Sequence, residues 1–167
     1  MNKKTFLIII SWILVIIWMG IIFWLSNMNT NESNDKSKKT ITKAITTTVE
    51  TTNKVGITDK HPSIENEQKV TEKLNAPLRK CMHASVYLVL AFLIMNALIL
   101  SNFKYSIAII LSILMSFTYA CSDEYHQTFV DGRTGHFSDV LIDTAGSMVG
   151  TCLYSIEYLI YKRFKKN

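Results

Sequence analysis

The sequence predicts an all-α protein, a four-span transmembrane helical bundle with both termini in the cytoplasm. Hydrophobic residues make up 49% of the 167 residues and gather in long blocks, whereas charged residues make up only 19%. The blocks have the length of membrane helices, since about 20 residues at a rise of 1.5 Å cross a hydrocarbon core of about 30 Å. Residues 1–167 are therefore expected to form a single membrane domain.

Four blocks are expected to cross the membrane. The first, 6–25, contains no charged residue, and the second, 81–100, is similarly apolar. The third, 105–121, is shorter, and the fourth, 140–160, carries two carboxylates. No ten-residue pattern of alternating polar and apolar positions is present, so the spans are expected to be helices rather than barrel strands.

The first block could instead belong to a cleaved signal peptide, because Lys3 and Lys4 precede it. An uncleaved anchor is favoured for two reasons. The block is longer than the usual apolar region of about 7–15 residues, and residues 25–29 offer no small-x-small cleavage site.

Basic residues next to the spans indicate the orientation. They precede the first span, separate the second from the third at Lys104, and follow the fourth at 162–166. Cytoplasmic flanks carry such an excess of Lys and Arg. The opposite, outer side then receives a polar loop, 27–80, and a motif loop, 122–138. The polar loop is also rich in lysine, but long loops depend less on charge for their placement.

The polar loop 27–80 is dominated by Thr, Asn, Lys, Glu and Ser, a composition typical of exposed segments without a core. Ile41, Ile45 and Val49 lie four apart, which would permit a short amphipathic helix on the membrane surface. Elsewhere, no Cys/His spacing typical of a zinc site is present, and neither a metal site nor a cofactor is predicted. Much of the net charge of +5 comes from the basic residues next to the spans, so this charge does not predict nucleic-acid binding.

Ionisable residues next to membrane spans are costly and are usually kept for function. They form three clusters at the expected outer face. The first comprises Lys80, His83 and Tyr87, the second Asp123, Glu124 and Gln127, and the third Arg133, Asp139 and Asp143.

Helical spacing relates these clusters to one another. His83 and Tyr87 lie four apart and share a helix face. If the third helix continues past residue 121, Glu124 and Gln127 form a polar cap that faces the bundle. Arg133 lies in a tight turn, where its guanidinium suits a carboxylate or a phosphate ligand. Alternatively, Arg133 only pairs with Asp139 or Glu124.

The start of the fourth helix places two carboxylates on one face. Asp139 is expected near its N-cap, and Asp143 lies one turn further along. Like charges at this spacing disfavour ionisation of both groups unless a cation or a shared proton intervenes, which favours a functional site over a structural hydrogen bond. Gly146 and Gly150 form a G-x-x-x-G pattern, best interpreted as close packing against another helix of the same chain, with homodimerisation the weaker option.

These motifs resemble the VanZ-like family of small bacterial membrane proteins. The resemblance rests on K-x-x-H-x-x-x-Y, from Lys80 to Tyr87, and on the segment 122–150 with its D-E-x-x-Q, G-R and D-x-x-x-D elements. One departure is that Ser26 is followed by Asn27 and Met28, where the family often has a glutamine two residues after the serine. The resemblance implies a multi-pass protein of the bacterial cell membrane whose ligand-binding positions are Lys80, His83, Tyr87, Asp123, Glu124, Gln127, Arg133, Asp139 and Asp143.

The resemblance also suggests a function. The family's namesake is associated with low-level resistance to teicoplanin, a glycopeptide with a fatty-acyl tail. A cell-envelope protein that binds a membrane lipid headgroup or a lipidated glycopeptide at the outer leaflet is therefore the first hypothesis.

Three alternatives stay open. One is an enzyme that acts on a lipid-linked envelope precursor, with Glu124 or Asp143 as general base, His83 as proton partner and Arg133 on a phosphate. Another is proton-coupled transport through His83, Glu124 and Asp143. A third is a divalent cation held by His83, Glu124, Asp139 and Asp143. The sequence does not decide whether a reaction is catalysed, or the oligomeric state.

Overall fold

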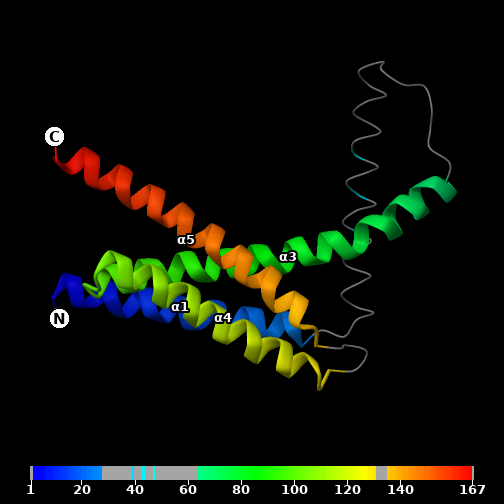
Figure 1. Cartoon of the computed structure of the whole chain (residues 1–167), viewed down its shortest axis with the longest axis horizontal. Coiled ribbons are helices and arrows are strands. Elements are labelled where there is room, and N and C mark those ends of the chain that lie inside the picture. The colour runs from blue at the N-terminus through cyan, green and yellow to red at the C-terminus, as the bar shows by residue number, and fades with distance from the viewer. Residues whose placement is uncertain are drawn as a thin grey trace, which may run out of the picture.

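The structure, a computed structural model, describes residues 2–27, 39, 43, 47, 64–130 and 135–166. Within this part of the chain the fold is all-helical and contains no strand, as predicted. Its four long helices are α1 (Lys3–Ser26), α3 (Ile64–Leu100), α4 (Tyr105–Gln127) and α5 (Phe137–Lys166) (Figure 1).

Among the described residues, three segments are long and apolar enough to cross a membrane, judged by length and composition. They are α1, the Lys80–Leu100 part of α3, and α4. The fourth expected span, 140–160, is helical and lies within α5, but it is not among these segments. Its two carboxylates and its many small polar residues reduce its hydrophobicity.

Both expected outer loops are partly helical. Helix α3 begins at Ile64, so nearly a third of the polar loop 27–80, its last part, continues directly into the second span. Helix α4 extends to Gln127, and α5 begins at Phe137, so the motif loop 122–138 is reduced to the residues between these two helices. The physical reason for the longer α4 is that its last turns bury Asp123, Glu124 and Gln127 inside the bundle. The proposed amphipathic helix at Ile41, Ile45 and Val49 lies outside the described residues.

The helices bring the two termini to the same end of the molecule (Figure 1). At this end, Lys4 Nζ donates to Asn102 Oδ1 at 2.8 Å, which joins the start of α1 to the α3–α4 turn. The Tyr105 and Tyr158 rings stack with their centroids 5.1 Å apart, which joins α4 to α5. The basic flanks of the spans therefore gather at one end, and the polar motifs lie at the other.

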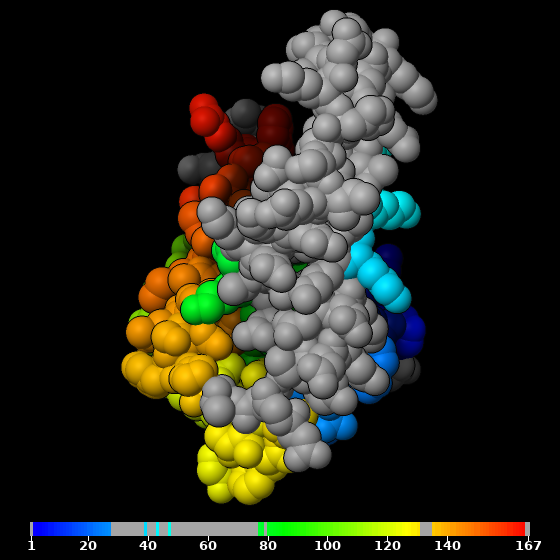
Figure 2. Space-filling view, turned by 90° about the vertical axis from the view of Figure 1, so that its right-hand side faces the viewer, coloured from blue at the N-terminus to red at the C-terminus, as the bar shows by residue number. Residues whose placement is uncertain are grey.

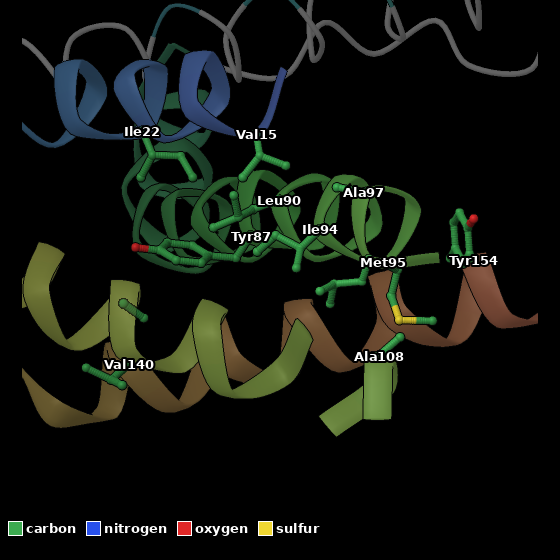
Figure 3. Packing of buried hydrophobic residues seen from close by; sticks show 12 residues of the cluster. Val15, Ile22, Tyr87, Leu90, Ile94, Met95, Ala97, Ala108, Val140 and Tyr154 are labelled. Atoms are coloured by element: carbon green, nitrogen blue, oxygen red, sulfur yellow. The ribbon is translucent and has the colours of Figure 1, made fainter. Parts of the chain in front are cut away.

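The apolar core is centred on α3 (Figure 3). Leu90 and Ile94 are almost fully buried there. Val15 and Ile22 of α1 pack against this helix, and Trp18 Nε1 donates to the backbone carbonyl of Val86 at 2.8 Å. Side chains from α4 and α5 complete the cluster, so all four helices share one core.

Helices α3 and α5 approach each other most closely. A Cβ atom added to Gly146 would collide with the backbone of Ala84, and one added to Gly150 would collide with the backbone of Leu88. The G-x-x-x-G pattern is thus used for packing within the chain, as predicted, because only a glycine lets two helix backbones come this near.

Replacement of Gly150 by alanine is expected to destabilise the fold by about 1–3 kcal/mol, since the added methyl group must push two backbones apart. Thermal unfolding of purified protein in detergent measures the effect. Gly20→Ala is the matched control, because nothing lies within 4 Å of a Cβ at Gly20. Equal melting temperatures for the two variants would show that the close crossing does not support the fold.

Candidate functional site

The predicted site residues gather where α1 and α4 end and α5 begins. Figure 2 shows the end of α4, in yellow, beside the beginning of α5, in orange. Polar side chains are buried at this end of the bundle, although burial of polar groups among apolar helices is costly unless they find partners. They are Ser26, Asp123, Glu124, Gln127 and Asp143, with Tyr87 from α3 completely buried beside them.

Asp123 is held by two donors from different positions. Ser26 Oγ of α1 donates to Asp123 Oδ2 at 2.7 Å, and Gln127 Nε2, one turn further along α4, donates to the same oxygen at 3.2 Å. The second oxygen, Oδ1, is buried without a hydrogen-bond partner among the described residues. Asp123 therefore ties α1 to α4 and keeps one acceptor available.

Asp143 is the most enclosed carboxyl group of the site, with a residue exposure of 1%. Neither of its oxygens has a hydrogen-bond partner within the part of the chain that the structure describes. Asp123, Glu124 and Asp139 all lie within electrostatic reach of it, so the surroundings are acidic. A buried carboxyl group in such a place either carries a proton or receives a donor from outside the described residues.

Tyr87 connects these two carboxylates from the α3 side. Its hydroxyl is buried within electrostatic reach of both Asp123 and Asp143. His83, half-buried, precedes it by one helical turn. The α3 motif therefore lies beside the α4 and α5 motifs in the structure.

Glu124 fixes the connection into α5. Its Oε2 accepts a hydrogen bond from the backbone N–H of His136 at 2.9 Å. The neighbouring Gly135 packs so tightly that a Cβ there would lie 2.6 Å from the carbonyl oxygen of Glu124. A glycine at 135 is therefore required for the chain to lie against the end of α4.

Lys80 and Asp139 form an ion pair at the exposed edge of the site, with 3.5 Å between Nζ and Oδ1. Asp139 lies in the first turn of α5 rather than at its N-cap, because the helix begins at Phe137. The side chain of Lys80 is 46% exposed, so this pair contributes little to stability. Its ammonium group is the described cation nearest to the acidic cluster.

Arg133 lies outside the described residues, so its expected pairing with Asp139, with Glu124 or with a ligand stays a prediction. The divalent-cation alternative gains no support. Among the described residues, no three His, Cys, Asp or Glu side chains are arranged to hold a metal ion.

Two further residues at the site were not predicted from the sequence. Ser26 was only noted as a family position, yet it donates to Asp123. His126 stacks on Phe23 of α1, with ring centroids 4.4 Å apart, and its Nε2 is buried without a hydrogen-bond partner in the described structure. Both involve contacts with α1, about a hundred residues away in sequence, so no local pattern could reveal them.

The site as a whole contains more acceptors than donors. Three buried carboxylate oxygens, one on Asp123 and two on Asp143, have no partner among the described residues. Such an arrangement can take up protons or bind groups that carry N–H or O–H donors, and a carboxylate held in this way can also act as a general base.

Comparison with known proteins identifies the family alone. No curated protein and no solved structure matches the chain. The family model described as VanZ/LLP1 matches residues 11–160, which include both sequence motifs, most of the first helical block and the other three blocks entire. The chain therefore belongs to the VanZ-like family, as the motifs predict.

Proposed function

We propose that this protein is a four-span protein of the bacterial cell membrane that binds a lipid headgroup or a lipidated glycopeptide at the outer leaflet. The observation that carries the proposal is the pair of unpartnered oxygens of Asp143 beside Asp123 and Tyr87. These groups require donors, and ammonium, amide and hydroxyl groups of a headgroup or a glycopeptide provide them.

The orientation in the membrane is supported by the distribution of charge. The basic flanks of the spans lie at one end of the bundle, and this end faces the cytoplasm by the positive-inside rule. The acidic site then opens at the outer face. Helix α5, with 30 residues, has a length of about 45 Å at 1.5 Å per residue, enough to cross the membrane as the fourth span.

Side chains around the site suit both the polar headgroup and the acyl tail of such a ligand. Lys80 is an exposed cation that can pair with a phosphate of a headgroup. Large aromatic side chains lie exposed at the same end of the bundle, where they can contact an acyl tail or the membrane interface. They are Trp24, Tyr125, Phe129 and Phe137, each at least 64% exposed.

The association of the family's namesake with teicoplanin connects this binding to low-level resistance. Teicoplanin carries amine and hydroxyl donors together with an acyl tail, the combination that an acceptor-rich site with an aromatic rim can hold. We propose that binding at the outer leaflet keeps the glycopeptide from its cell-wall target.

A second candidate function is acid–base catalysis on a lipid-linked phosphate substrate. It is favoured by one observation, the proximity of Asp143 to Glu124, because paired carboxyl groups can divide the roles of acid and base. In this alternative His83 relays the proton, and Lys80 or Arg133 holds the phosphate.

The orientation predicts which residues are accessible from outside intact cells. With the three native cysteines replaced by serine, single cysteines at Ser63 and Thr134 should react with a membrane-impermeant maleimide, and one at Asn167 should react only after lysis. Labelling of Asn167 in intact cells, with protection of the other two positions, would place the acidic site in the cytoplasm.

Replacement of Asp143 by asparagine is expected to weaken teicoplanin binding about tenfold or more, since a charge-assisted hydrogen bond contributes about 1.5–3 kcal/mol. Isothermal titration of purified protein in micelles gives the affinity. Glu157→Gln is the matched control, because it removes one carboxylate from an exposed position nearer the other end of α5. An equal loss in both variants, or no binding by the unaltered protein, contradicts the proposal.

The catalytic alternative makes a separate prediction. Glu124→Gln should abolish product formation from a lipid-linked phosphate substrate, because the amide cannot accept a proton as a general base. Phosphate release or a mobility shift of the lipid in thin-layer chromatography detects turnover. If the unaltered protein turns over no envelope lipid yet binds teicoplanin, catalysis is ruled out as its role.

A further inference from the structure

A second polar feature lies at the opposite end of the bundle from the acidic site. Four residues of α5 line an open pocket of about 340 Å³: Tyr158, Tyr161, Lys162 and Lys165. Their spacing of three, four and seven residues places them on one face of the helix. None of them belongs to the family motifs, and the proposed function uses the lysines only as part of the basic flank that indicates orientation.

The pocket is cationic and aromatic. Lys165 Nζ lies 5.9 Å from the centre of the Tyr161 ring, a cation–π distance. Neither lysine forms an ion pair with a carboxylate of the described chain. Residues 158–166 contain no Asp or Glu, so no acidic side chain of these turns neutralises the two charges.

Other cations lie at the same end of the bundle. Lys3, Lys4 and Lys104 are exposed and lie at the same end of the bundle, where Lys4 contacts the α3–α4 turn. The potential at this end is therefore positive, and it favours an anion over a zwitterion. An adjoining set of exposed apolar side chains continues along α5: Ile156, Leu159, Ile160 and Phe164.

We propose that this pocket binds the phosphate headgroup of an anionic phospholipid, with its acyl chains along the apolar surface of α5. Lys162 and Lys165 pair with the phosphate, and Tyr158 and Tyr161 lie at the membrane–water interface, where tyrosine is enriched. Free phosphate lacks the acyl chains that would use the apolar surface. The inference rests on α5 crossing the membrane and is independent of the ligand at the acidic end.

Native mass spectrometry of the full chain, released from micelles, tests this proposal. Phosphatidylglycerol is expected to bind at least about tenfold more tightly than phosphatidylcholine, and inorganic phosphate at equal concentration should not displace it. Lys162→Ala combined with Lys165→Ala should weaken phosphatidylglycerol binding about tenfold, because each cation near an anionic surface contributes a severalfold effect.

The matched control is Lys3→Ala combined with Arg163→Ala, which removes two positive charges at the same end but outside the pocket. It should retain binding within about twofold, and the double Lys→Arg variant at 162 and 165 should retain it as well. An equal loss in the control would mean that general positive charge, not this pocket, attracts the lipid. Equal binding of phosphatidylcholine, or displacement by phosphate, would also overturn the proposal, and neither result bears on teicoplanin binding.

Discussion

The close crossing of α3 and α5 is the contact on which the acidic site depends. Gly146 and Gly150 let the backbone of α5 lie directly against Ala84 and Leu88. Because both pairs advance by four residues, the two helices run in the same direction and stay in register through this contact. Asp143 precedes the contact on α5 by one turn, and Tyr87 lies within it on α3. Ser147 of α5 also contacts α3, since it is completely buried and its Oγ lies 3.5 Å from the Tyr87 carbonyl oxygen.

The crossing also explains why Asp143 can stay without a partner. A larger residue at the contact would separate the helices and admit lipid or water to the carboxyl group, whereas the small residues keep it enclosed at 1% exposure. Asp123 is held differently, by Ser26 and Gln127. The site thus combines one anchored carboxylate with one that the fold encloses but does not satisfy. Burial of a carboxyl group without a partner destabilises a fold, and a bound ligand or a proton on the carboxyl group removes this destabilisation.

Much of this arrangement follows from local sequence, and the rest depends on contacts between distant helices. Hydrophobic blocks predict the helices, and four-residue spacing predicts that His83 and Tyr87 share a face and that Gly146 and Gly150 mark a packing surface. The helical continuation of α4 to Gln127 was conditional, because polar residues after an apolar block are equally typical of a loop. The role of Ser26 depends on where α1 ends relative to α4, which spacing within either segment does not determine. The turn at Asn102, with its φ of 64°, joins α3 to α4.

Helix α5 begins in an acidic region and ends in a basic one. Residues 123–139 contain four carboxylates and one arginine, whereas all the charged residues that follow Glu157 are cations. The net charge of +5 therefore conceals an acceptor-rich site and a separate basic end. Groups with N–H and O–H donors suit the first end, and phosphates suit the second. Since the rigid α3 crossing lies between the two ends, a lipid bound at the basic end would fix the depth of α5 in the membrane. If α5 crosses the membrane as proposed, the same contact would also set the depth of Asp143 in the membrane.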